Sequence, residues 1–153
     1  MNEANLTALR IAVVDDSAHS RRTVRSMLNG FGCRDIYEAE DGVEALDILQ
    51  HVAPDVVITD LVMPIFTGIE LVKMIRAHMT GVRDVPIIIL TAYPSRQHIL
   101  EARRAGADVI LAKPVSPKAL YDRVVHLIRR PRSRSAMEVT ASIDDGDPVV
   151  TSD

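Results

Sequence analysis

Short apolar runs alternate along the chain with longer segments in which apolar positions recur every three or four residues. Five of the runs have the length of a strand and are rich in β-branched or other apolar residues, which favour strands. They are RIAVV (10–14), DIYEA (35–39), DVVIT (55–59), PIIIL (86–90) and DVILA (108–112). The segments between them have the spacing of amphipathic helices. The pattern therefore predicts five strand–helix units.

The last predicted helix runs from Ser116 to about Arg130. Ser116 followed by Pro117 is typical of a helix N-cap with proline at the first helical position. The apolar residues of this segment form one stripe, which faces the core: Leu120, Val124, Leu127 and Ile128. This helix is expected to close the domain.

Strands that alternate with helices at this spacing build a parallel sheet with helices on both faces, so most of its strands are buried. The segment 35–39 is more polar than the other runs and suits an edge strand. The predicted fold class is therefore α/β, with a doubly wound five-stranded parallel sheet in the order 2-1-3-4-5. Residues 9–130 form this domain, and residues 1–8 are an N-terminal extension.

The segment 131–153 has no periodicity, many Ser, Thr, Asp and Pro residues, and no long apolar run. We expect a flexible C-terminal tail here. No output domain follows the α/β segment in this sequence, so a DNA-binding domain is not expected. Four arginines at 129–135 have no aromatic residues among them and are interpreted as a solvated linker.

Composition narrows the choice of compartment and partner. The formal net charge is −3, which gives no general reason to expect nucleic acid as a partner. The single cysteine, Cys33, excludes an intramolecular disulfide and fits a reducing compartment. The sequence shows neither a secretory signal nor an apolar run long enough for a membrane helix. A cytoplasmic protein without a membrane partner is expected.

Polar residues follow the predicted strands at their carboxyl ends, where doubly wound sheets bind ligands. Strand 1 is followed by Asp15 and Asp16, and strand 3 ends at Asp60. Thr91 ends strand 4, and Lys113 follows strand 5. Because strands 1 and 3 are neighbours at the switch point of the sheet, three carboxylates are expected to meet there.

Clustered carboxylates raise each other's pKa values and need a cation nearby. Lys113 supplies one positive charge, and oxygen ligands without cysteine or histidine favour a hard ion such as Mg²⁺. Taken singly, each of these polar residues has an ordinary explanation as a helix cap, a turn residue or an exposed lysine. Together, four strands that end in Asp, Thr or Lys residues are explained better by one functional site than by separate caps and turns.

These residues also carry a family resemblance over about Leu9–Arg130: the chain resembles the response-regulator receiver domains of two-component signalling, of the CheY type. The motifs are VVDDS at 13–17, D-x-x-M-P-x-x-x-G from Asp60 to Gly68, Thr91-Ala92 and Lys113-Pro114. Each motif is weak alone, and their order and register together are specific.

The resemblance implies that Asp60 is the nucleophile that accepts a phosphoryl group from a histidine kinase or a histidine phosphotransfer protein. It implies that Mg²⁺ is held by Asp15, Asp16, Asp60 and the backbone carbonyl of Val62, and that no other cofactor is bound. Lys113 and Thr91 would contact the phosphoryl group. Thr91 would then bias a surface formed by helix 4, strand 5 and helix 5, and the Lys113–Pro114 bond is expected to be cis.

Two features differ from the common receiver pattern or fall at its variable positions. Ile110 stands where many receivers carry an aromatic switch residue, so coupling is expected to run through the loop after strand 4. Val62 and Tyr93 lie two residues after Asp60 and Thr91, where we expect them to hinder the hydrolytic water and lengthen the phosphoryl lifetime.

Other functions remain as alternatives of lower weight. A small Mg²⁺-dependent phosphatase commonly has a second acid two residues after its nucleophile, and position 62 is valine. A nucleotide-binding site is not expected, because the turn after strand 1 is acidic rather than glycine-rich. A phosphorylation-independent interaction module is the remaining alternative. The preferred interpretation is a single-domain signalling phosphoacceptor, monomeric or weakly dimeric, that is not an enzyme and acts on an unknown protein target or in a phosphorelay.

Overall fold

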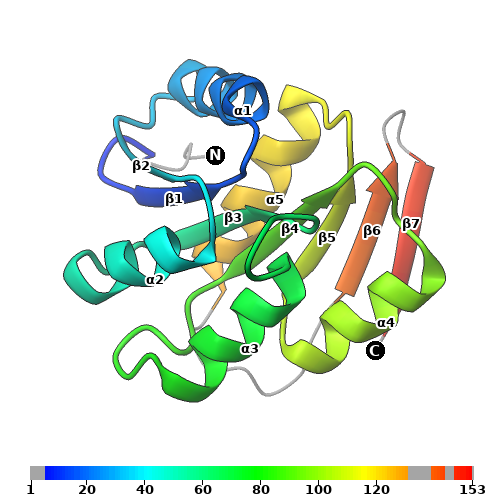
Figure 1. Ribbon diagram of the computed structural model, residues 1–153. Helices are drawn as coiled ribbons and strands as arrows, with labels where there is room; N and C mark the ends of the chain where they lie inside the picture. Colours follow the sequence, from blue (N-terminus) through cyan, green and yellow to red (C-terminus); the bar gives the residue numbers. More distant parts are fainter. Residues whose placement is uncertain (1–5, 131–138, 144–146, 153) are drawn as a thin grey trace.

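The computed structural model describes residues 6–130, 139–143 and 147–152. The described residues form five helices and seven strands, and the strands make one sheet with helices on both faces (Figure 1). In chain order the elements are β1 (Arg10–Val14), α1 (Ala18–Gly30), β2 (Asp35–Ala39), α2 (Gly42–His51), β3 (Val56–Asp60), α3 (Gly68–His78), β4 (Ile87–Thr91), α4 (Arg96–Ala105), β5 (Val109–Ala112), α5 (Pro117–Arg129), β6 (Val139–Ile143) and β7 (Asp147–Ser152).

The first five strands are parallel and lie in the order β2-β1-β3-β4-β5, which confirms the predicted α/β fold. Strands β3 and β4 begin and end one residue later than predicted, and β5 begins one residue later. Pro86 lacks an N–H and precedes β4, while its carbonyl accepts a hydrogen bond from Val57.

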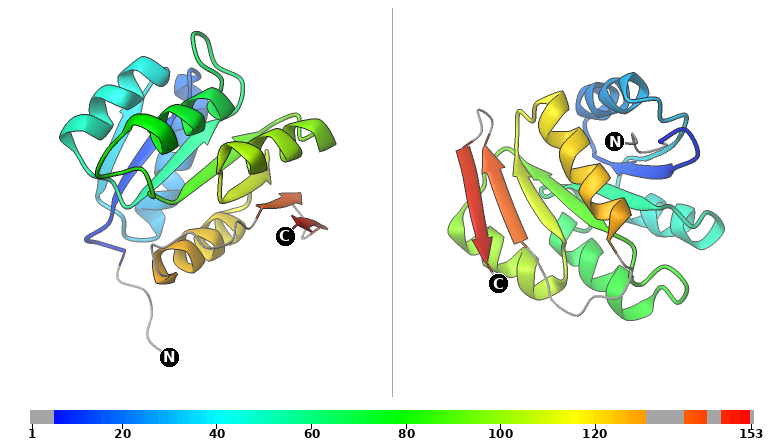
Figure 2. Two further views of the ribbon diagram at one scale, coloured as in Figure 1. Left: turned by 90° about the horizontal axis from the view of Figure 1, so that it is seen from below. Right: turned by 180° about the vertical axis from the view of Figure 1, so that it is seen from behind.

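Helices cover both faces of the sheet (Figure 2), and a separate apolar core lies on each face. One core contains buried residues of α1 and α5, among them Leu28 and Leu120. The other contains buried residues of α2, α3 and α4, among them Leu49 and Ile75. Because both faces are covered, β3, β4 and β5 consist almost entirely of buried residues, as their continuous apolar sequences predicted.

Side chains with backbone-capping chemistry set the helix starts. Ser17, Asp41, Thr67, Ser95 and Ser116 each accept a hydrogen bond from a backbone N–H in the first turn of the helix that follows. Helix α5 begins at Pro117 behind the Ser116 cap, as predicted. Among the described residues, no helix has both the length and the apolar character needed to cross a membrane.

The structure differs from the prediction in the C-terminal segment. Where a tail without regular structure was predicted, β6 pairs in parallel with β5 and β7 pairs antiparallel with β6, so the sheet has seven strands. The physical reason is that β5 would otherwise present unpaired N–H and C=O groups at the edge of the sheet. Strands β6 and β7 also contain β-branched residues, which favour strands. These residues stand in groups too short to be recognised by a search for long apolar runs.

The predicted boundaries fall partly on residues outside those described. Residues 1–5, 131–138, 144–146 and 153, which belong to the predicted extension and tail, lie outside the described residues. Within the predicted extension, Leu6 is buried and packs in the core beneath α1 and α5. The apolar side chain of Leu6 therefore belongs with the domain rather than with an extension.

Candidate functional site

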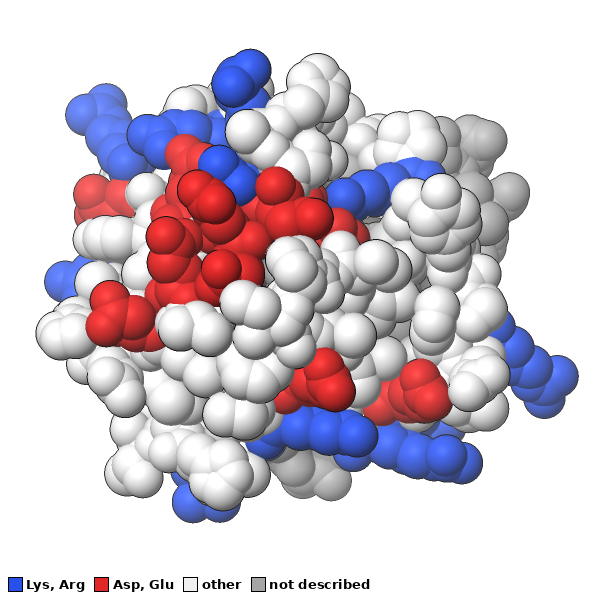
Figure 3. Space-filling view, in the orientation of Figure 1, with Lys and Arg blue, Asp and Glu red and all other residues white. Residues whose placement is uncertain are grey.

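The three predicted carboxylates converge at the carboxyl edge of the sheet. Strands β1 and β3 pair with Val14 opposite Thr59, so the residues that follow these partners, Asp15 and Asp60, are neighbours. Asp15, Asp16 and Asp60 each offer an oxygen atom, and these atoms lie within 4.8 Å of one another. Figure 3 shows acidic side chains gathered into one area on this face of the molecule. The site is thus formed by residues that are far apart in the sequence.

Lys113 brings a positive charge into the same cluster. Its Nζ donates a hydrogen bond to Asp15 Oδ2 at 3.1 Å and lies 3.5 Å from Asp60 Oδ1. Strand β5, which precedes Lys113, is separated from β3 by β4, so the lysine side chain reaches across the end of β4. The structure therefore brings the predicted lysine to the predicted acids.

Asp60 is partly buried and electrostatically constrained. Its Oδ1 accepts a hydrogen bond from the N–H of Leu61 at 2.8 Å. Burial raises the pKa of Asp60 above its ordinary value, and the charge of Asp15 raises it further, while Lys113 and the Leu61 N–H oppose the rise. A cation bound at this site would stabilise the ionised form.

Thr91 lies at the end of β4 with its side chain buried. Its Oγ1 accepts a hydrogen bond from the N–H of Tyr93 at 3.0 Å, and its backbone carbonyl accepts one from the N–H of Lys113 at 2.8 Å. The Thr91 hydroxyl proton is not used in the Tyr93 contact. Thr91 is thus fixed to both the loop after β4 and the end of β5.

The remaining sequence features also have definite positions. The side chains of Val62 and Tyr93 are exposed, whereas Ile110 is buried in β5. The peptide bond between Lys113 and Pro114 is cis, as the resemblance implied. Ile110 is packed in the core beside α3 and α4, so an aromatic switch residue is absent from this position.

Gly68 shows why the loop after Asp60 requires a glycine. A Cβ at position 68 would lie 2.2 Å from the backbone oxygen of Asp60. The N–H of Gly68 donates a hydrogen bond to the carbonyl of Leu61 at 2.7 Å, which closes the loop against the end of β3. Met63, from the same motif, is buried in the core with α3. The motif therefore shapes the backbone that presents Asp60.

Sequence reasoning missed Arg21, whose guanidinium donates a hydrogen bond to the backbone carbonyl of Asp15. A basic residue near the start of α1, where the helix dipole favours anions, was the available indication. It also missed Asp108, a buried carboxylate that pairs with Arg76 and Arg130. Asp108 precedes β5 and so lies at the opposite edge of the sheet from the acidic site.

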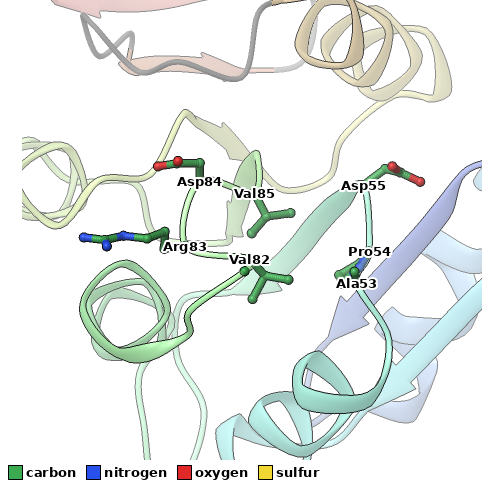
Figure 4. Close-up of a pocket in the computed structure, with 8 residues that line it drawn as sticks. Ala53, Pro54, Asp55, Val82, Arg83, Asp84 and Val85 are labelled. Atoms are coloured by element: carbon green, nitrogen blue, oxygen red, sulfur yellow. The ribbon is translucent and has the colours of Figure 1, made fainter.

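A hollow of about 480 Å³ also lies at that opposite edge (Figure 4). It is formed by the loop before β3, which includes Pro54, and the loop before β4, which includes Val82 and Val85. The side chains of Arg83 and Asp84 point away from Pro54. This hollow is separated from the predicted site by the length of the strands and contributes no residue to it.

Comparison with known proteins agrees with this geometry. The family model for the response regulator receiver domain matches residues 11–125. A chemotaxis protein CheY homolog of Campylobacter jejuni is 35% identical over 131 residues, which cover 85% of this chain and 100% of that protein. Chemotaxis protein CheY-3 of Vibrio cholerae is 34% identical over 122 residues, covering 80% of this chain and 93% of that protein.

Solved structures show the same likeness. Chemotaxis protein CheY4 of Vibrio cholerae superposes with a TM-score of 0.73 at 34% identity, covering 78% of this chain and 98% of that chain. A putative response regulator from Chloroflexus aurantiacus gives a TM-score of 0.75 at 31% identity, covering 80% and 98%. Membership of one family accounts for the acidic cluster, the lysine that reaches it and the strand order. The chain belongs to the response-regulator receiver family, as a CheY-like domain of two-component signalling.

Proposed function

We propose that Asp60 accepts a phosphoryl group from the phosphohistidine of a histidine kinase or a histidine phosphotransfer protein. The observation that supports this is the convergence of Asp15, Asp16 and Asp60 with Lys113 at one edge of the sheet. A carboxylate nucleophile and a fixed ammonium are the groups that this transfer needs.

The chemistry follows from the two oxygens of Asp60. Oδ1 is engaged by the Leu61 N–H and lies near Lys113, whereas Oδ2 has no hydrogen-bond partner among the described residues. Oδ2 attacks the phosphorus in line, an O–P bond forms, and the P–N bond to the donor histidine breaks with its electron pair returning to the imidazole. Lys113 stabilises the negative charge of the phosphoryl oxygens.

The oxygen-rich cluster fits a hard divalent cation. Asp15, Asp16, Asp60 and the backbone carbonyl of Val62 would hold Mg²⁺ in this proposal. When bound, Mg²⁺ supplies positive charge that lowers the repulsion between the carboxylates and the incoming phosphoryl group.

Thr91 connects the phosphoryl site to the rest of the fold. In the proposal, its hydroxyl donates a hydrogen bond to a phosphoryl oxygen and moves the loop that contains Tyr93. Because a backbone hydrogen bond joins Lys113 to Thr91, the end of β5 moves together with the end of β4 when the site is phosphorylated. The switching surface comprises α4, β5 and α5, and β6 pairs with the edge of β5, so the hairpin β6–β7 forms part of this surface.

The proposed output is a protein–protein contact rather than catalysis on a separate substrate. Self-phosphorylation and self-dephosphorylation are the only reactions in the proposal. In this proposal the downstream partner is a protein, and the chain does not contact DNA directly. The chain itself acts in the cytoplasm as a monomer or weak dimer.

Intact-mass measurement of the full chain tests the proposal. Incubation with Mg²⁺ and a small acyl phosphate is expected to add one phosphoryl group, about 80 Da. The addition should require Mg²⁺ and be absent from Asp60→Asn. If neither the acyl phosphate nor a phosphorylated histidine donor protein modifies Asp60, the proposal is wrong and the phosphorylation-independent interaction module takes its place.

A further inference from the structure

Arg21 occupies a position that helix stability does not explain. It lies near the amino end of α1, whose first turn contains no acidic residue. A cation there opposes the helix dipole, which favours negative charge at this end. The side chain is nevertheless only 14% exposed, so its guanidinium is held against the protein rather than in solvent. Its contacts show what holds it there.

The guanidinium of Arg21 connects the acidic site to β2. Nη1 donates a hydrogen bond to the backbone carbonyl oxygen of Asp15 at 2.7 Å, and Nε donates one to Glu38 Oε1 at 3.0 Å. Glu38 also pairs with Arg25, whose hydrogen bond is the main cause of the lowered pKa of Glu38. The ionised Glu38 therefore fixes the orientation of Arg21.

Arg21 completes the set of contacts that immobilise Asp15. The N–H of Asp15 donates to the carbonyl of Ala39 at 3.0 Å, Oδ1 accepts from the N–H of Ser17 at 2.9 Å, and Oδ2 accepts from Lys113. The carbonyl bound by Arg21 belongs to the peptide group that joins Asp15 to Asp16. Arg21 thus restrains the peptide that leads into the exposed Asp16.

We propose that Arg21 is a positioning residue of the acidic site, and that it strengthens the binding of a divalent cation despite its own positive charge. The inference rests on the proposed function, because it concerns the cation-binding carboxylates of that site. Two physical effects of Arg21 have opposite signs. Its charge repels a cation, whereas its hydrogen bond to the Asp15 carbonyl keeps the carboxylates in the arrangement that binds one.

Arg25 provides a matched control. Arg21→Gln and Arg25→Gln each remove one positive charge and one partner of Glu38, but only Arg21 donates to the Asp15 carbonyl. If charge alone mattered, both variants would bind Mg²⁺ more tightly. If Arg21 positions the site, Arg21→Gln binds Mg²⁺ more weakly and Arg25→Gln does not.

The experiment is a Mg²⁺ titration of the full chain at constant ionic strength, followed in amide NMR spectra to give Kd for the wild type and each variant. Arg21→Gln is expected to raise Kd about tenfold, the low end of the range for residues that orient metal ligands. Arg21→Lys keeps the charge but has a single donor nitrogen in place of the two that Arg21 uses, so its Kd should lie between those of the wild type and Arg21→Gln.

Hydrogen exchange without Mg²⁺ gives a second measurement. Amides near Asp15 and Asp16 should exchange faster in Arg21→Gln than in Arg25→Gln, while the thermal unfolding of both variants shows that the domain is folded. If Arg21→Gln is unfolded, the comparison uses Arg21→Lys instead. Equal Kd values for the matched variants would overturn the inference alone. A wild-type chain that binds no Mg²⁺ would overturn both the metal part of the proposed function and this inference.

Discussion

The ammonium of Lys113 lies between two carboxylates, with Nζ 3.1 Å from Asp15 Oδ2 and 3.5 Å from Asp60 Oδ1. One fixed cation therefore serves two strand ends that each deliver negative charge to the same place. This compensation is incomplete, because the pKa of Asp60 is still raised, chiefly by burial. The ionised form of Asp60 is consequently less stable in the folded protein than the ionised form of an exposed aspartate would be.

Asp60→Asn is expected to stabilise the fold at neutral pH in the absence of Mg²⁺. Protonated Asp60 favours the folded state because its folded pKa is above the ordinary value of 3.8. This favourable contribution is complete below 3.8 and is lost as the pH rises through the folded pKa. Urea unfolding at pH 7 should therefore show Asp60→Asn to be more stable, with the difference shrinking toward pH 3. A variant less stable than the wild type at pH 7 would mean that the Lys113 pair outweighs burial.

Gly68→Ala should destabilise the domain and disturb Asp60 together. The new Cβ would meet the Asp60 backbone oxygen at 2.2 Å, so the start of α3 must move. We expect a loss of about 1–3 kcal/mol in the free energy of unfolding, the usual cost of overpacking, and slower phosphorylation. Gly30→Ala is the control, because a Cβ at position 30 would meet no atom outside its own helix within 4 Å and alanine is the better helix former. Equal effects of the two substitutions on unfolding would contradict this explanation.

The fold was predictable because its main determinants are local. The apolar runs gave strand positions within one residue, and Ser116-Pro117 gave the start of α5. The approach of Asp15, Asp60 and Lys113 to one another was predictable for a related reason. In a parallel sheet, residues at successive strand ends meet at one edge, so their positions in the sequence determine their approach.

The features that were missed depend on tertiary contacts that the hydrophobic pattern does not indicate. Nothing near Arg76 in the sequence indicates that it pairs with Asp108, 32 positions later. Arg21 was missed because its role depends on the side chain folding back toward the Asp15 backbone. The pairing of β6 with β5 was missed because an edge strand binds its neighbour through backbone hydrogen bonds. Nearly every residue type can form these bonds, so composition indicates them poorly.

Asp108→Ala is expected to destabilise the fold strongly without a direct effect on the site. Asp108 is buried, pairs with Arg76 at 3.0 Å and Arg130 at 2.7 Å, and accepts a hydrogen bond from the N–H of Ile87. Removal of one partner from such a pair costs about 3–5 kcal/mol. Chemical denaturation should show this loss, while the folded variant keeps its phosphorylation rate because Asp108 lies at the opposite edge of the sheet.

The exposed pair of Lys118 and Asp122 provides the control for that experiment. Asp122→Ala removes an exposed ion pair on the surface of α5, and such pairs contribute little to stability because water screens them. If Asp108→Ala costs no more than Asp122→Ala, the buried network does not contribute to stability as its geometry indicates.

Val62 and Tyr93 are expected to lengthen the lifetime of phosphorylated Asp60. Both side chains are exposed and follow Asp60 and Thr91 by two residues. We expect apolar or bulky groups at these positions to hinder the hydrolytic water. The double variant Val62→Asn, Tyr93→Glu offers polar groups that orient water, and its dephosphorylation should be faster by at least about tenfold, a modest part of the range for general acid–base catalysis. Decay of the phosphorylated mass over time measures the rate, and a wild-type decay as fast as that of the variant contradicts the expectation.

Ile65 carries a backbone strain that a single substitution should relieve. Its φ is +71°, a left-handed conformation that is costly for a β-branched residue, and its side chain is 66% exposed. Asparagine tolerates this conformation, so Ile65→Asn should stabilise the fold by about 1 kcal/mol. Ile65→Val, which keeps the β-branch, should give no such gain in urea unfolding. If Ile65→Asn is instead less stable than Ile65→Val, packing of the isoleucine side chain contributes more than the backbone strain costs.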